Sequence, residues 1–131
     1  MVGIVIVSHS SKIAQGIVDL ARQMSDPELT MIAAGGMRDG SIGTDAAMVG
    51  EAIEKANTGD GAVILAEFGS AVLSAELALE LIDENLRSTV KIADAPIVEG
   101  AIGAAVSASV GDSLEDVIEA AEAARNLSKL S

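Results

Sequence analysis

The only histidine of the chain, His9, lies between a continuous apolar segment and a segment of helical periodicity. A strand that ends in Ser-His-Ser-Ser and opens into a helix places an imidazole at a sheet's carboxyl edge, beside a helix amino terminus. One imidazole nitrogen can accept a phosphoryl group when the other donates a hydrogen bond to a carboxylate or carbonyl. With no cysteine, tyrosine or tryptophan in the sequence, few other side chains can act as nucleophiles. His9 is therefore either a nucleophile or a structural histidine that satisfies a helix end or a neighbouring carbonyl.

Two polar residues that follow the third apolar segment are expected close to His9. Glu67 ends that segment, where a carboxylate can hold the imidazole N–H and stabilise positive charge on the ring. Ser70 begins the next helical segment, where its hydroxyl can donate to a phosphoryl oxygen and the helix-start amides favour an anion. The structural alternatives are a solvated acid at a strand end and a plain N-cap serine. Ser10 and Ser11 allow the same two interpretations as Ser70.

A glycine-rich segment over residues 35–43 is expected to form a flexible wall of the same site. It lacks the Gly-Lys-Ser/Thr of a Walker motif and does not match the dinucleotide-binding glycine pattern. Its one cation, Arg38, either meets a phosphoryl group or a partner, or is a solvated loop arginine. One histidine without a second histidine or a cysteine makes a poor transition-metal site, so we expect no metal.

Apolar segments of strand length alternate with segments of helical period along the chain. We expect strands over residues 2–7, 29–34, 62–66 and 90–93, and helices capped by Ser11 and Thr44 and over residues 70–85, 97–109 and 113–127. Such alternation predicts an α/β fold with an open, doubly wound, mainly parallel sheet and helices on both faces. The site of such a fold lies at the carboxyl ends of the strands, where the strand order reverses, and that edge would collect His9, the glycine-rich segment and Glu67.

The segment over residues 70–85 is apolar around much of its circumference. A helix of this kind needs burial beyond one sheet face, and a subunit interface would supply it. The sequence therefore predicts a homodimer.

Acidic residues outnumber basic ones 20 to 8, which gives a formal net charge of −12. Such a chain repels phosphate backbones and anionic lipid, so binding to nucleic acid or to a membrane surface is not expected. The charge indicates either solubility, including adaptation to high salt, or steering of a basic partner. The absence of cysteine fits a reducing cytosol, and the apolar start is too short for a signal peptide, so we expect a cytoplasmic protein.

The strand followed by Val7-Ser8-His9-Ser10 and a helix resembles the mannose-type IIA domains of the phosphoenolpyruvate-dependent phosphotransferase system. Three further segments are similar to the phosphoryl-carrier subunits of dihydroxyacetone kinases. They are Gly35-Gly36 with Asp39-Gly40-Ser41-Ile42-Gly43-Thr44, then Gly69-Ser70-Ala71, then Ala95-Pro96-Ile97-Val98-Glu99-Gly100-Ala101. Their order and spacing match over nearly the whole chain.

The resemblance implies one IIA domain over residues 1–131 that forms a homodimer, with His9 as the phosphorylated histidine through Nε2. The phosphoryl group would come from the phosphohistidine of the carrier HPr, a separate protein. It would pass to ADP held by the nucleotide-binding kinase subunit, and the resulting ATP would phosphorylate dihydroxyacetone on a third subunit. No cofactor or metal of its own is implied.

Glu67 stands where the resembled carriers usually have aspartate, in Asp-Leu-Gly-Ser-Ala, and here the segment begins Glu67-Phe68. The extra methylene keeps the carboxylate but moves it by about 1 Å, which matters for orientation. Two alternatives to the carrier subunit stay open. One is a sugar-transport IIA domain that passes phosphate to a IIB domain, and the other is a non-catalytic regulatory domain with a flavodoxin-like sheet.

Overall fold

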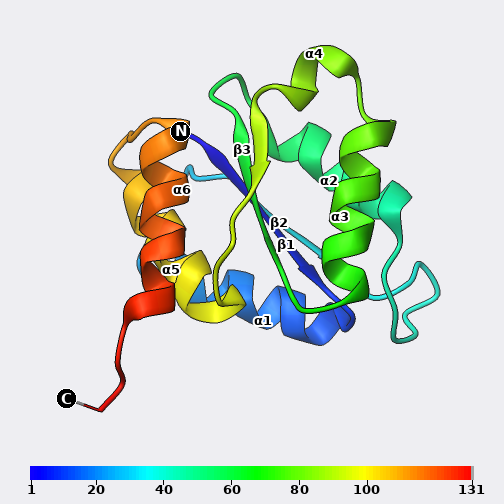
Figure 1. The fold of residues 1–131 in the computed structure, drawn as a ribbon, viewed down its shortest axis with the longest axis horizontal. Coiled ribbons are helices and arrows are strands. Elements are labelled where there is room, and N and C mark those ends of the chain that lie inside the picture. Colours follow the sequence, from blue (N-terminus) through cyan, green and yellow to red (C-terminus); the bar gives the residue numbers. More distant parts are fainter. Residues whose placement is uncertain (131) are drawn as a thin grey trace.

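The computed structural model describes residues 1–130 and shows one four-stranded sheet between two layers of helices (Figure 1). In chain order the elements are β1 (Gly3–Ser8), α1 (Ser11–Arg22), β2 (Met31–Gly35), α2 (Ala46–Ala56), β3 (Ala62–Ala66), α3 (Ser70–Leu81), α4 (Glu84–Arg87), β4 (Val90–Ile92), α5 (Ile97–Ser109), α6 (Leu114–Glu122) and the 3₁₀ helix η1 (Ala123–Asn126).

The strands are parallel and lie in the order β2-β1-β3-β4. All six residues of β1 are buried, as expected for a central strand that is covered on both faces. From the central strand β1 the chain crosses to the edge strand β2 on one side, and from the central strand β3 it crosses to β4 on the other side. The direction in which strands are added therefore reverses between β1 and β3. This confirms the α/β fold and puts His9 at the switch point between two adjacent strands.

Two hydrophobic clusters cover the two faces of the sheet. One joins side chains of β1 and β3 to buried residues of α1, α5 and α6. The other joins the opposite faces of the same strands to α2 and α3. Alternate residues of β1 enter alternate clusters, Ile4 and Ile6 the first and Val5 and Val7 the second, as the period of a strand requires.

Two expected helix caps are wrong by one residue. Ser10, not Ser11, caps α1, because Ser10 has the extended backbone of an N-cap and its hydroxyl accepts from the amide of Ile13. Asp45, not Thr44, caps α2, and its carboxylate accepts from the first amides of that helix.

The helix expected over residues 70–85 is two helices. The chain becomes extended at Ile82, and Asp83 caps the short α4 by accepting from the amide of Asn85. The last helix also ends earlier than expected, at Glu122, and continues as η1.

Over residues 1–130, no helix is long and apolar enough to cross a membrane.

Candidate functional site

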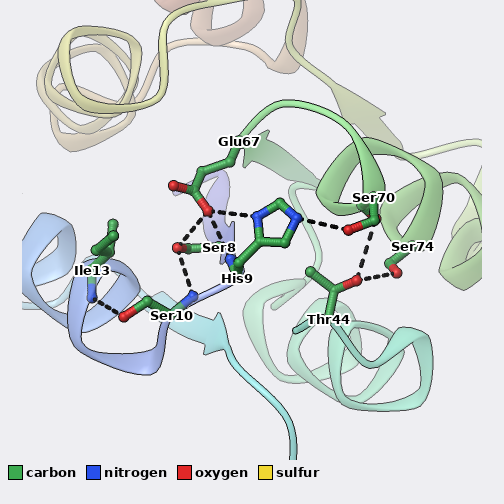
Figure 2. Close-up of polar contacts among 8 residues, drawn as sticks. All are labelled: Ser8, His9, Ser10, Ile13, Thr44, Glu67, Ser70 and Ser74. Atoms are coloured by element: carbon green, nitrogen blue, oxygen red, sulfur yellow. Dashed lines mark hydrogen bonds and ion pairs between the residues drawn. The ribbon is translucent and has the colours of Figure 1, made fainter. Parts of the chain in front are cut away.

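His9 lies between the last residue of β1 and the N-cap of α1, with 24% of its side chain exposed. The parallel partner β3 ends beside it, and the segment that follows β3 supplies both neighbours of the imidazole (Figure 2). The structure thus brings together His9, Glu67 and Ser70, the three residues that the sequence predicted for the site.

One oxygen of Glu67 holds His9 from two directions. Oε1 lies 3.0 Å from His9 Nδ1 and accepts the His9 backbone N–H at 2.7 Å. The same oxygen accepts the hydroxyl of Ser8 at 2.7 Å. The longer glutamate side chain therefore reaches the imidazole in this chain.

The carboxylate fixes the tautomer of the ring. An ionised carboxylate can only accept hydrogen bonds, so His9 Nδ1 carries a proton and donates the hydrogen bond that Glu67 accepts. The lone pair of the neutral ring is then on Nε2. The Ser70 hydroxyl lies 2.7 Å from Nε2 and donates to it in this tautomer.

The environment of Glu67 favours its charged form. Burial acts to raise the pKa of this carboxyl, but hydrogen bonds from the His9 N–H, the Ser8 hydroxyl and the His9 ring act against it, and the pKa is lowered from its ordinary value. Glu67 is thus an anion at neutral pH and can stabilise positive charge on the imidazole.

Ser70 is positioned by an unusual turn. Gly69, the N-cap of α3, has φ 63° and ψ −123°, a conformation that residues other than glycine rarely adopt. The turn makes Ser70 the first residue of α3 and brings its hydroxyl to His9 Nε2.

A second hydroxyl pair holds the start of α3. The Thr44 hydroxyl lies 2.7 Å from the hydroxyl of Ser74, and it donates to the backbone carbonyl of Ser70 at 3.3 Å (Figure 2). These contacts join the end of the glycine-rich segment to the helix that carries Ser70.

The glycine-rich segment forms a wall of the site through its backbone. The amide of Gly43 donates to the His9 carbonyl at 2.8 Å, and the amide of Gly36 donates to the Ser8 carbonyl at 3.1 Å. Arg38 instead pairs with Glu51 at 2.6 Å, and with Asp45 at 3.6 Å. The guanidinium of Arg38 is therefore paired with the N-cap of α2 and with an acidic residue within that helix.

Phe68, the single aromatic residue, lies against the imidazole. The ring centroids of His9 and Phe68 are 5.3 Å apart with an interplanar angle of 30°, and Phe68 is 80% exposed. Aromatic side chains of this kind are enriched in protein interfaces.

Sequence reasoning assigned no role at the site to Ser8, Phe68, Thr44 or Ser74. Two positions in the sequence could have indicated a role at the site: Ser8 directly precedes the histidine, and Phe68 lies between Glu67 and Gly69. No spacing pattern pointed to the Thr44–Ser74 contact, which joins a loop to a helix 30 residues further along the chain. Within residues 1–130, no group of three or more His, Asp or Glu side chains is placed to bind a metal.

Comparisons with known proteins show the family of the chain. The family model EIIA-man, described as the PTS system fructose IIA component, matches residues 3–118. A phosphoryl donor subunit DhaM of a PEP-dependent dihydroxyacetone kinase from Listeria innocua is 41% identical, and the alignment covers 91% of this chain and 95% of that protein. The corresponding DhaM from Providencia stuartii is 43% identical over 95% of this chain, which spans only 27% of that longer protein.

A solved structure has a similar fold. The crystal structure of EF1359, a protein described as of unknown function, matches with a TM-score of 0.85 and 38% identity over 93% of each chain. The family model and the Listeria innocua relative each match along most of the chain. The chain therefore belongs to the EIIA-man family of PTS IIA components, in which it groups with the DhaM phosphoryl donor subunits.

Proposed function

We propose that the chain is the phosphoryl-carrier subunit of a phosphoenolpyruvate-dependent dihydroxyacetone kinase and that His9 is its phosphorylated residue. The observation that supports this most directly is the pair of contacts on the imidazole, Nδ1 to Glu67 and Nε2 to Ser70. These contacts support a role for Nε2 as the nucleophile, with the Ser70 hydroxyl within reach of a phosphoryl group bound there.

In the first step, the Nε2 lone pair attacks the phosphorus of a phosphohistidine on the donor, HPr. The new P–Nε2 bond forms as the donor's P–N bond breaks, and the electron pair of that bond returns to the donor nitrogen. His9 keeps its proton on Nδ1 and gains positive charge, which the Glu67 carboxylate stabilises. The Ser70 hydroxyl turns from Nε2 to a phosphoryl oxygen.

In the second step, a terminal phosphate oxygen of ADP attacks the same phosphorus. The P–Nε2 bond breaks and its electron pair returns to Nε2, so the neutral imidazole is regenerated with its Nδ1 proton unmoved. ADP is held by the nucleotide-binding kinase subunit, and the ATP that forms phosphorylates dihydroxyacetone on a third subunit. This chain needs no metal or cofactor of its own for either step.

A carrier must hold the phosphoryl group without trapping it. At this site the side-chain donor within reach of Nε2 is the neutral hydroxyl of Ser70. The cation Arg38 instead pairs with Asp45, the N-cap of α2, and with Glu51 within α2. Neutral donors stabilise the group less than a cation would, which keeps both transfers close to balanced.

The relatives support the system in which the carrier works. The Listeria innocua and Providencia stuartii proteins are named as phosphoryl donor subunits of dihydroxyacetone kinases, and a Lactococcus lactis relative as the phosphotransferase subunit of a PTS-dependent one. We accordingly propose that residues 1–131 form one IIA domain that acts in the cytoplasm as a homodimer.

The proposal is tested by incubating the protein with phosphoenolpyruvate, enzyme I and HPr. We expect one acid-labile phosphate per chain, no labelling of His9→Gln, and slower labelling of a folded Glu67→Gln. Labelling of His9→Gln would overturn the assignment of His9.

The acceptor is tested separately, because a sugar-transport IIA domain would be labelled in the same way. Labelled protein mixed with the kinase subunits, ADP and dihydroxyacetone should yield dihydroxyacetone phosphate. Transfer to a IIB domain without transfer to the kinase subunits would favour the transport alternative. Partner binding without any labelling would favour a regulatory domain.

A further inference from the structure

We propose that Ser8 is a positioning residue of the phosphoryl-transfer site, whose buried hydroxyl anchors the Glu67 carboxylate on the Nδ1 side of His9 (Figure 2). This inference rests on the proposed function of His9, and it concerns how the imidazole is prepared for that function.

The direction of the Ser8 hydroxyl is determined by its two partners. Ser8 is fully buried, and its Oγ accepts the backbone N–H of Ser10 at 3.0 Å. An amide N–H can only donate and a carboxylate can only accept, so the single hydroxyl proton must point to Glu67. Because Ser10 is the N-cap of α1, the start of that helix orients the hydroxyl.

Ser8 is also the one donor of this cluster that is independent of the imidazole residue. Of the three donors that reach Glu67 Oε1, the backbone N–H and the ring Nδ1 both belong to His9. The ring contact can move with the imidazole, whereas the His9 backbone N–H and the Ser8 hydroxyl approach the carboxylate from two adjacent residues at the end of β1. The Ser8 hydroxyl ties the carboxylate to β1, whose residues are all buried.

The length of the Glu67 side chain makes such an anchor useful. Glutamate has one more rotatable bond than aspartate, so holding its carboxylate in a single orientation costs more conformational entropy. A buried, oriented hydroxyl at 2.7 Å restricts that freedom before the phosphoryl group arrives.

A purely structural role, in which Ser8 only satisfies the Ser10 amide, makes different predictions. The chain offers a matched control in Ser107 of α5, which is also buried and donates to a carboxylate, that of Asp112, at 2.7 Å. Ser107→Ala removes the same kind of bond from a different part of the molecule.

The decisive measurement is ¹⁵N NMR of the His9 ring in the unphosphorylated protein, which requires no donor protein. We expect the wild type and Ser107→Ala to hold the Nδ1–H tautomer, and Ser8→Ala to lose a substantial part of it to the Nε2–H form. Phosphoryl acceptance from HPr should fall about tenfold in Ser8→Ala, the effect of one lost hydrogen bond of about 1.4 kcal/mol. Ser107→Ala should accept phosphate at the wild-type rate.

A ¹³C titration of Glu67 reports on the bond itself. Removal of a donor from the charged form should raise the pKa of Glu67 in Ser8→Ala toward its ordinary value. Ser8→Cys keeps a weaker donor of similar shape and should give intermediate tautomer fractions and rates. It also serves as the test variant if Ser8→Ala fails to fold.

An unchanged tautomer in Ser8→Ala or Ser8→Cys overturns the positioning role, even where the Glu67 pKa rises or transfer slows. Failure of the proposed function gives a different pattern. In that case the tautomer shifts in the Ser8 variants, while the wild type takes no phosphate from HPr.

Discussion

At His9, two side chains each form a hydrogen bond with a different nitrogen of the imidazole. Glu67 accepts a hydrogen bond from Nδ1–H, and the Ser70 hydroxyl donates one to Nε2, so the two ring nitrogens have opposite roles before any substrate arrives. This division depends on a strand-end carboxylate and a helix-start hydroxyl that come from one short segment after β3. The conformation of the segment between β3 and α3 thus determines both contacts.

Much of this site could be predicted from residue types. His9, Glu67 and Ser70 follow strands that end at the same sheet edge, and parallel pairing brings such ends together. The roles of Ser8 and Thr44 could not be predicted, because the direction of a hydroxyl depends on which donors and acceptors the packed loops present to it. The same packing decided that Arg38 pairs with Glu51 and Asp45.

The lowered pKa of Glu67 predicts how its contribution to stability depends on pH. Since the pKa is lower in the folded than in the unfolded state, the contribution is present above the ordinary value of 4.5 and is lost as pH falls through the lowered folded pKa. Urea unfolding of the wild type and Glu67→Gln, followed from about pH 7 to about pH 3, should show a stability difference that is constant at the upper end and shrinks at the acidic end. A difference that stays constant to the lowest pH would contradict a carboxylate held ionised by these hydrogen bonds.

At the scale of elements, α3 links the site to the rest of the fold. Its first residue is Ser70, and Thr44 ties that first turn to the segment before α2. The sequence predicted where this helix begins but not where it ends. Apolar residues continue past its last turn, and the break at Ile82 depends on Asp83 capping a new turn, which hydrophobic periodicity does not register.

Substitution of Gly69 should affect phosphoryl transfer more than the free energy of unfolding alone explains. A Cβ at this position meets no atom within 4 Å, so the cost of Gly69→Ala is the strain of its positive φ, about 1 to 2 kcal/mol of unfolding free energy. Relief of that strain would move Ser70 away from Nε2, and we expect phosphoryl acceptance to fall by about tenfold or more. Urea unfolding and HPr-dependent labelling measure the two effects.

Gly111→Ala is the matched control for this turn. Gly111 also has positive φ, 84°, with open space where the methyl group of an alanine would lie, and it follows α5 in a different part of the chain. It should lose a similar free energy of unfolding and keep the wild-type rate of labelling. Equal loss of activity in both variants would show that strain alone, and not the position of Ser70, slows transfer.

At the scale of the whole molecule, α3 packs with its small side chains inward and its large ones outward. Ala71, Ala75 and Ala78 are fully buried against the sheet. Leu73 and Leu81, in contrast, are 66% and 62% exposed. A chain with net charge −12 that leaves a row of leucines in water has an apolar face suited to a subunit interface.

The predicted homodimer can be tested on this face. Leu77, 48% exposed, lies between Leu73 and Leu81 at a spacing of four residues, so all three share one side of α3. Light scattering at micromolar concentration should give the mass of two chains for the wild type and of one chain for Leu77→Glu, because a buried, unpaired carboxylate opposes association. Leu20→Glu on α1, at a residue 46% exposed, adds the same charge elsewhere and should leave the dimer intact. A monomeric wild type would refute the dimer, and a dimer that survives Leu77→Glu would place the interface on another face.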